Sequence, residues 1–351
     1  MAYASITKPG LHFNTKLYTG TGSSNAITGV GFQPDFTWIK SRNNGSNNNH
    51  MLFDAVRGAT KYVKSDQNSA ENTLAETLKS FDSDGFTVGT QGDVNTNSIN
   101  FVSWNWKASN STGSTNNDGS IATTVSVNTT AGFSIVKWTG TGSSGTLGHG
   151  LGAIPNAIWV KKTSQADDWF NWHTALGAQG KINFNNTSAV QNDTGYWNNT
   201  TPTNQVFSVT SNGANNASGQ TYMAYCFTSI KGYSKFGVYQ GISSNSGNSK
   251  YPFIYLGFKP AWVMVKAYDA VKSWYIWDNK RNENNLTTTA LIADGGDAEF
   301  TGSNIDIYNN GFKIKDTGSG TNSNGNNYTY YAFASEPLVA NIGQSIPATA
   351  R

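Results

Sequence analysis

Charged residues and cysteine are scarce in this sequence of 351 residues. Lysine, arginine, aspartate and glutamate together make up 13% of the chain, about half of the usual share of roughly 25%. The single cysteine, Cys226, excludes an internal disulfide framework and every zinc site built on cysteine pairs. Because Cys226 lies in an aromatic run at 222–227, we expect an inert thiol buried in a strand.

Long apolar runs are missing as well. No stretch approaches the roughly 18 apolar residues of a membrane helix, so we expect no membrane insertion. Residues 1–6 do not combine a basic region with an apolar core, so we expect no Sec-type signal peptide. The net charge of +3 is spread over 24 basic and 21 acidic residues. This weak and scattered charge argues against a nucleic-acid partner.

The sequence is rich in uncharged polar residues, glycine and aromatic residues. The chain has 37 glycines and 13% aromatic residues, whereas disordered chains are poor in aromatics. Short β-branched and aromatic runs are separated by Asn-Gly and Asp-Gly pairs, which accept the positive φ of tight hairpins. The pattern predicts an all-β protein of antiparallel β-sandwiches, of the jelly-roll or lectin-like kind. One segment, 69–81, has apolar residues at helical spacing, and a helix is one of two interpretations of it.

Three motifs recur in the same order along the chain. The hexapeptide at 19–24, TGTGSS, returns unchanged at 139–144. An apolar-Gly-x-x-Pro motif follows, with a lysine six residues after each proline, at Pro34 and Lys40, Pro155 and Lys161, and Pro260 and Lys266. Each copy closes on an aromatic strand, at 101–106, 222–227 and 328–333. This order indicates three tandem copies of one module.

The repeat sets the expected domain boundaries. We expect an N-terminal arm at 1–10, modules at 11–108, 120–230 and 231–337, and a C-terminal tail at 338–351. Residues 109–119, rich in Ser, Thr, Asn and Gly, predict a flexible linker. No such linker precedes residue 231, so modules 2 and 3 are expected to pack rigidly together.

Asp-x-x-Arg pairs follow the proline motif in two of the three copies. The pairs are Asp54 with Arg57 and Asp278 with Arg281, and the middle copy has His173 at the aspartate position. We expect each pair to hold a loop by a salt bridge or bidentate hydrogen bonds.

Catalytic and metal-binding patterns are weak. The four histidines show no His-x-His or His-Glu-x-x-His spacing, so we expect no metal and no cofactor. The carboxylates of Asp82 and Asp84 fit a hairpin turn better than the facing pair that a glycosidase requires. We therefore expect no enzyme activity.

Tryptophans in modules 2 and 3 allow two interpretations. Alternating aromatic positions usually form the core. Exposed aromatic rings flanked by amides instead bind glycans or protein partners. The candidate contact residues are Trp169, Trp172, Trp197, Trp274 and Trp277.

With these motifs the chain resembles a family of virion proteins of tailed phages, common among phages of marine and freshwater bacteria. The resemblance covers nearly the whole chain. It rests on residues 13–20, 31–35, 50–58, 132–136, 148–152, 222–227, 232–237 and the terminal 347–351. It implies a three-repeat, tail-fibre-like structural protein with lectin-like sandwiches, a virion location, a complete C-terminus and no catalytic residues.

These observations favour a surface appendage of the tail-fibre or tail-tip type that contacts the host surface, with a host polysaccharide as candidate ligand. A head decoration or cement protein is the first alternative, and a polysaccharide depolymerase is the second. The expected partners are other virion proteins and further copies of the chain, with a trimer favoured. The protein would be made in the host cytoplasm and reside on the surface of the extracellular particle.

Overall fold

The computed structural model describes residues 4–45, 48–243, 250–282, 285–316 and 320–338. The expected tail beyond residue 338 lies outside the described residues. The fold is nearly all-β with antiparallel sheets, as the composition and turn pattern predict. The helical segments are single turns: η1 (Pro9–Leu11), α1 (Gly92–Asn95), η2 (Thr174–Leu176), α2 (Thr194–Trp197) and α3 (Gly213–Asn216). No helix among the described residues is long and apolar enough to cross a membrane.

Module 1 is a sandwich of a larger and a smaller sheet. The larger sheet has the order β1 (Phe13–Thr19), β9 (Asn100–Trp106), β3 (Phe36–Ser41), β4 (Met51–Asp54). The smaller sheet has the order β2 (Asn25–Thr28), β8 (Gly85–Val88), β7 (Leu78–Asp82). A separate short ladder joins β5 (Lys61–Tyr62) and β6 (Asn72–Thr73).

Module 2 repeats this design with extra strands at one edge. Its larger sheet has the order β10 (Ser114–Asn116), β11 (Thr123–Asn128), β12 (Phe133–Thr139), β19 (Thr221–Phe227), β14 (Ala157–Lys162), β15 (Phe170–His173). Two short ladders accompany it: β13 (Gly145–Gly148) with β18 (Val206–Val209), and β16 (Gly180–Lys181) with β17 (Gln191–Asn192). Strand β10 lies within 109–119, where a flexible linker was expected. That part of the segment is therefore an edge strand, held by its pairing with β11.

Module 3 merges the two layers into one eight-stranded sheet. Its order is β20 (Ser234–Gln240), β27 (Asn327–Pro337), β22 (Phe258–Ala267), β23 (Trp274–Asp278), β24 (Thr287–Ile292), β25 (Phe300–Tyr308), β26 (Gly311–Ile314), β21 (Phe253–Tyr255). Strands β20 and β21 are the two ends of this nearly closed sheet.

The strand registers place the repeated residues at equivalent positions. Trp106 pairs with Phe36, Phe227 with Ala157, and Phe333 with Trp262. Each of these partners lies two residues after a proline of the repeat, namely Pro34, Pro155 and Pro260. Pro34 and Pro155 precede their strands, whereas Pro260 lies inside β22 at an irregularity of the register. Since proline cannot donate to a ladder, an irregular position in the strand accommodates it.

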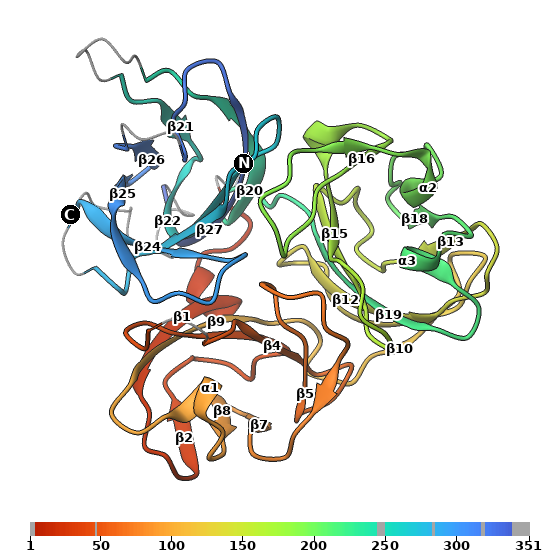
Figure 1. Ribbon diagram of the computed structural model, residues 1–351, viewed down its shortest axis with the longest axis horizontal. Coiled ribbons are helices and arrows are strands. Elements are labelled where there is room, and N and C mark those ends of the chain that lie inside the picture. The colour runs from red at the N-terminus through yellow and green to blue at the C-terminus, as the bar shows by residue number, and fades with distance from the viewer. Residues whose placement is uncertain (1–3, 46–47, 244–249, 283–284, 317–319, 339–351) are drawn as a thin grey trace.

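The three modules surround one shared core (Figure 1). Strand β19 shows how the alternation of side chains builds it: Tyr225 and Phe227 face the shared core, whereas Tyr222 and Cys226 face the core of module 2 itself. Because successive side chains of a strand point to opposite faces, both faces of this sheet are covered. Burial raises the pKa of the Cys226 thiol well above its ordinary value, as expected for an inert core position.

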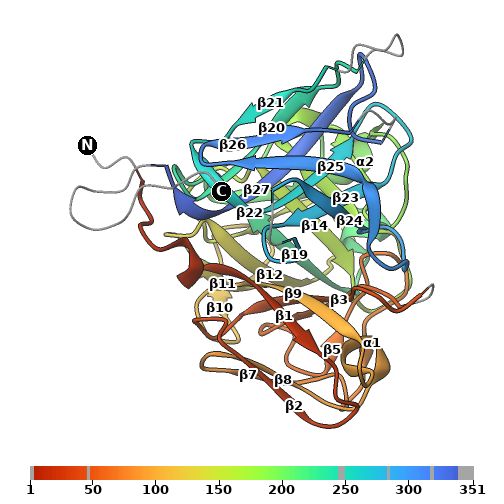
Figure 2. The same ribbon diagram turned by 90° about the vertical axis from the view of Figure 1, so that its left-hand side faces the viewer.

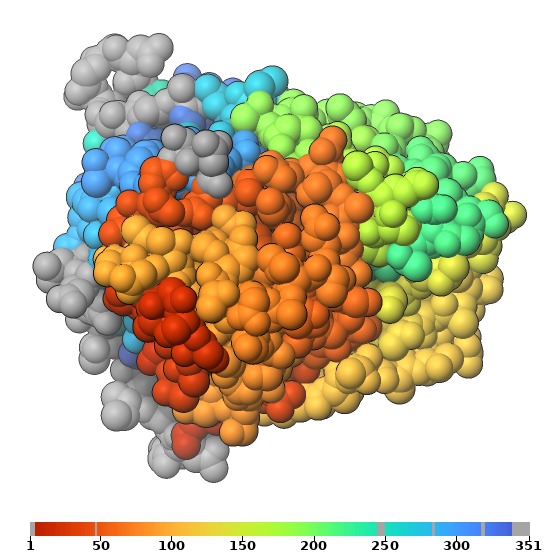
Figure 3. All heavy atoms as spheres, turned by 60° about the horizontal axis from the view of Figure 1, so that its bottom comes forward, coloured from red at the N-terminus to blue at the C-terminus, as the bar shows by residue number. Residues whose placement is uncertain are grey.

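Aromatic contacts join the modules pairwise across the shared core. Ring centroids are 4.1 Å apart for Phe36 and Tyr225, 5.8 Å for Trp159 and Tyr331, and 5.7 Å for Trp106 and Trp262. In the side view of Figure 2, module 1 lies below module 3, and module 2 lies behind module 3. In the space-filling view, the surface of module 1 continues directly onto modules 2 and 3 (Figure 3).

The helix predicted at 69–81 is wrong. The segment contains β6 and β7 instead, and Leu74 is 41% exposed while Leu78 is buried. The backbone N–H of Glu71 donates to the carbonyl of Thr163 in module 2, at 2.8 Å. Pairing of β6 with β5 and of β7 with β8, together with this bond to module 2, therefore overrides a local helical pattern, which is a weak preference by itself.

The hairpin expected at Asp82 and Asp84 is present between β7 and β8. Asp84 accepts hydrogen bonds from the backbone N–H groups of Gly29 and Gly31, at 2.9 and 2.6 Å. These bonds lower the pKa of the Asp84 carboxyl. Asp82 accepts hydrogen bonds from the hydroxyls of Ser80 and Thr87, both at 2.7 Å, so both carboxylates hold local structure.

Candidate functional site

The repeated lysines lie at the interfaces between modules. Each side-chain Nζ donates to a backbone carbonyl of the neighbouring module: Lys40 to Gly296 at 3.1 Å, Lys161 to Asn68 at 3.3 Å, and Lys266 to Thr187 at 3.3 Å. Each also bonds the carbonyl of the residue that follows it. Burial lowers the pKa of all three ammonium groups to about 8. The lysine of the repeat is thus a buried donor that joins one module to the next.

A second hydrogen-bond donor recurs in the three modules, at the start of the strand that carries the Asp-x-x-Arg motif or its counterpart. Trp169 Nε1 donates to Lys64 O at 2.7 Å, and Trp274 Nε1 donates to Asn183 O at 2.9 Å. In module 1 the same place is taken by His50, whose Nε2 lies 2.9 Å from Ile292 O. All three bonds cross from one module to another, so these rings belong to the interfaces.

The other three candidate tryptophans serve their own modules. The indole nitrogens of Trp172, Trp197 and Trp277 donate to carbonyls of Gly177, Gly180 and Ser303. None of the five candidate tryptophans is more than 2% exposed. Stacking on a sugar requires an exposed ring face, so their interpretation as glycan or partner contacts is wrong. They are core and interface residues because alternate positions of these strands face either a sandwich core or the shared core.

Both Asp-x-x-Arg pairs form the expected salt bridges. Arg57 Nε lies 2.5 Å from Asp54 Oδ2, and Arg281 Nε lies 2.6 Å from Asp278 Oδ2. Each aspartate also accepts the backbone N–H of its arginine, at 2.8 and 2.9 Å. All four side chains are buried, so the pairs fix the turns that follow β4 and β23.

In modules 1 and 3 the aspartate of this pair also accepts a hydrogen bond from a side chain of another module. Asp54 accepts a hydrogen bond from the Tyr225 hydroxyl at 2.9 Å, and Asp278 accepts one from Trp104 Nε1 at 3.1 Å.

In module 2, His173 stands at the position of Asp54 and Asp278. The ring of His173 packs edge-on against Tyr331, with centroids 5.3 Å apart. The contacts of Asp54, His173 and Asp278 therefore run from module 1 to module 2, from module 2 to module 3 and from module 3 to module 1. Such a head-to-tail contact closes into a ring when its rotation repeats three times.

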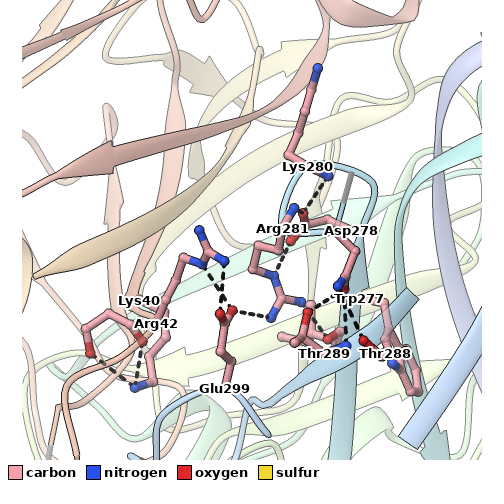
Figure 4. A network of polar contacts seen from close by, with 12 residues as sticks. Lys40, Arg42, Trp277, Asp278, Lys280, Arg281, Thr288, Thr289 and Glu299 are labelled. Atoms are coloured by element: carbon pink, nitrogen blue, oxygen red, sulfur yellow. Dashed lines mark hydrogen bonds and ion pairs between the residues drawn. The ribbon is translucent and has the colours of Figure 1, made fainter. Parts of the chain in front are cut away.

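Figure 4 shows the interface between modules 1 and 3, where Glu299 lies between two arginines. Arg42 binds its carboxylate with two nitrogens, at 3.1 and 2.9 Å. Arg281 Nη1 lies 3.5 Å from the same carboxylate. The equivalent bridge at module 1 joins Arg57 Nη1 to Glu71, at 3.2 Å. Planar two-point binding of this kind favours a single geometry.

This arrangement is suited to holding modules together. The buried histidines have lowered pKa values because burial disfavours their charged forms, and that of His173 falls to about 3. Among the described residues, no group of three or more His, Cys, Asp or Glu side chains gathers as a metal site would require. At the interfaces, the repeated lysines and the Trp169 and Trp274 indoles bind backbone carbonyls of neighbouring modules, and these bonds fix the orientation of the modules.

Three exposed aromatic residues were not among the candidates from the sequence. Phe253, Tyr255 and Tyr308 lie on the outer face of module 3. Only the strand registers of the structure reveal the contrast, because they place small or polar residues at the same positions in module 1 and, for β21, in module 2.

One family model, described as "Domain of unknown function (DUF7483)", matches residues 8–337. No curated protein and no solved structure gives a significant match to the chain.

Proposed function

Since the chain belongs to the family described as "Domain of unknown function (DUF7483)", a description that assigns no activity, we propose its function from its architecture. The protein is a non-catalytic structural component on the outside of a tailed-phage particle, of the tail-fibre or tail-tip type, that contacts the host surface. The observation that carries this proposal is the closed ring of three modules. Its repeated lysine, tryptophan and aspartate contacts make one body out of three sandwiches.

The centre of the ring supports a structural role. Trp106 and Phe333 lie 5.6 Å apart between ring centroids, and Phe227 and Phe333 lie 5.9 Å apart. These side chains are buried, so packed aromatics occupy the place where modules meet. A filled centre suits mechanical cohesion, and leaves the outer faces of the modules for recognition.

The threefold arrangement within one chain also favours the second candidate, a head decoration or cement protein. A single copy can lie on a local threefold axis of a shell, just as it can cap a trimeric appendage. A homotrimer of the chain remains a separate prediction. A depolymerase is less well supported, because the described Asp54, Asp84 and Asp278 carboxylates are engaged in structural bonds.

Immunogold electron microscopy of purified particles tests the proposal. Antibodies against the full chain should label intact particles, at the tail for an appendage or over the shell for a decoration protein. Pre-immune serum provides the control. Gold that is absent from particles, with the chain recovered only in the particle-free lysate, would contradict a virion role.

A further inference from the structure

An exposed aromatic surface distinguishes module 3. Phe253 and Tyr255 on β21 are 46% and 50% exposed, and Tyr308 at the end of β25 is 36% exposed. Between the first two, Ile254 points inward and is 6% exposed. We call the three outward rings the aromatic platform. Large exposed apolar side chains that gather in one place often mark interaction sites.

The other modules show that the fold does not require these rings. Ile27, Leu147 and Ile254 are equivalent, since each pairs with the phenylalanine of the next strand. The residues that flank the first two are Ala26 and Thr28 in module 1 and Thr146 and Gly148 in module 2. The position of Tyr308, which pairs with Gly311, is held by Asp82 in module 1, which pairs with Gly85.

The geometry of the platform is defined by a glycine beneath it. Gly311 pairs with both Tyr255 and Tyr308 on its two sides. A Cβ at residue 311 would come within 3.1 Å of the Phe253 ring and 2.1 Å of the Ile254 carbonyl oxygen. The absence of that Cβ lets Phe253 lie across the strand, where it meets Tyr308 edge-on with centroids 5.6 Å apart.

Lysines flank the rings. Lys313 is the register partner of Phe253, and Lys235 Nζ lies 5.6 Å from the centre of the Tyr255 ring. Lys235 also donates to the Tyr255 carbonyl, at 2.6 Å. Asp306 is the acidic group that pairs in register with Lys313, and it lies 3.9 Å from Lys315.

A cavity of ≈ 440 Å³ adjoins the platform in the seam between β20 and β21. Its lining includes Tyr255, Lys235 and Ser234. This volume is in the range of small-molecule sites, which extends from about 300 to 1,000 Å³.

We propose that the aromatic platform and the adjoining cavity bind an acidic polysaccharide that contains uronic acid. The ring faces stack on sugar rings, while Lys235 and Lys313 attract the carboxylates. The biological setting of this site, contact with the host surface, rests on the proposed function. A protein strand added to β21 fits less well, because Lys235 already occupies the Tyr255 carbonyl at that edge.

Binding of polygalacturonate oligosaccharides to the full chain provides the test. The same oligosaccharides with methyl-esterified carboxyls serve as a neutral probe, since esterification removes the negative charge and leaves the sugar rings unchanged. Isothermal titration should give a dissociation constant on the order of a millimolar or tighter for the acid form. Esterification should weaken binding by about tenfold or more, in line with the loss of a charge-assisted contact.

Variants that carry the residues of module 1 identify the site. Phe253→Ala and Tyr255→Thr introduce the residues that Ala26 and Thr28 supply there, so the sheet should persist. Each should weaken binding by about tenfold or more, that is by about 1.4 kcal/mol or more, because each removes a ring that stacks on the sugar. Val271→Thr, at a position 67% exposed on another loop, is the matched control and should bind like the wild type. Equal melting temperatures ensure that all four proteins are folded.

Three results would overturn the proposal: no binding of the acid form, equal binding of acid and ester, or unchanged binding by both platform variants. None of these results affects immunogold labelling of particles, so failure of the glycan site is distinguishable from failure of the virion role.

Discussion

At the scale of single residues, the repeated lysine shows how the modules are joined, because its ammonium group is buried at an interface between two modules. An ammonium group removed from water is costly unless it is fully hydrogen-bonded. Lys161 meets this condition with the carbonyls of Asn68, Lys162 and Asp167, at 3.3, 2.9 and 2.8 Å. Two of these carbonyls belong to its own module and one to module 1. The lysine therefore couples the folding of a module to the presence of its neighbour.

Replacing Lys161 by methionine should lower the free energy of unfolding by about 1–3 kcal/mol, because buried carbonyls lose their donor. Denaturant melts at pH 7 measure the change. An exposed Lys79→Met substitution on β7 is the control and should stay within about 0.5 kcal/mol. A Lys161→Met protein as stable as the wild type would show that the inter-module bond contributes nothing.

The same lysines predict a pH dependence. Burial lowers their pKa to about 8 in the folded chain, against about 10.4 for a lysine in an unfolded chain. Between these values the unfolded state binds more protons, so stability should rise with pH from about 8 to about 10. The difference in unfolding free energy between wild type and Lys161→Met should grow over this window. A difference that is flat or falls with pH would contradict the assignment.

Trp106 closes the aromatic strand of module 1 and is fully buried in the shared core. Its replacement by alanine should cost about 3–5 kcal/mol, the usual penalty for removing a large aromatic side chain. Chemical denaturation followed by circular dichroism measures this cost. A loss below about 1 kcal/mol would mean that the strand is not core.

At the scale of elements, the turn after β15 differs from its two counterparts. His173 stands where the other copies have aspartate, and Leu176 stands where they have arginine. His173 still accepts the N–H of Ala175, at 3.1 Å, and so caps η2 as an aspartate would. The turn is therefore retained while the buried ion pair is replaced by a neutral ring and an apolar side chain.

Introducing an Asp-Arg pair at positions 173 and 176 tests whether the turn of module 2 keeps the geometry of its counterparts. His173→Asp alone should destabilise the chain by about 3–5 kcal/mol, because a carboxylate would be buried without a partner. Adding Leu176→Arg should recover part of the loss, with a coupling energy of about 0.5–3 kcal/mol in a double-mutant cycle. Additive effects of the two substitutions would show that the turn of module 2 has lost the geometry of its counterparts.

At the scale of the whole molecule, the shared core makes the modules interdependent. Tyr225 of module 2 contacts Phe36 of module 1, and Tyr331 of module 3 contacts Trp159 of module 2. A module on its own would expose this aromatic face to water. The ring should therefore behave as one cooperative unit and not as three linked domains.

Scanning calorimetry of the full chain should accordingly give one unfolding transition, with the calorimetric enthalpy close to the van't Hoff enthalpy. The Trp106→Ala substitution should shift this single transition as a whole. Three separate transitions, or a shift of one transition among several, would contradict a shared core.

Much of the fold could be predicted because its patterns are local. The Asn-Gly and Asp-Gly turns, the period-2 strands and the ordered repeat of motifs are properties of neighbouring residues. The Asp54–Arg57 and Asp278–Arg281 salt bridges also lie within one turn, so their spacing alone indicated them. The helix expected at 69–81 failed because the segment pairs with β5 and β8 of module 1, and because Glu71 bonds to Thr163 of module 2.

The candidate site could not be predicted in the same way. Trp274 and Tyr255 both lie in aromatic strand segments, yet the first is buried and the second is half exposed. Alternation along a strand separates two faces, but a face is buried only if another sheet covers it. Only the three-dimensional arrangement shows which face meets a neighbouring module.

The sequence by itself therefore determined the strands, the three copies and the residues at equivalent positions, because hydrophobic alternation and turn chemistry act over a few residues. The tertiary structure alone decided that the copies close into a ring, that the repeated lysines reach across it, and that one outer face of module 3 stays open. Those properties depend on how whole sheets pack. Packing sums many weak contacts between residues far apart in the chain, so no short stretch of sequence contains them.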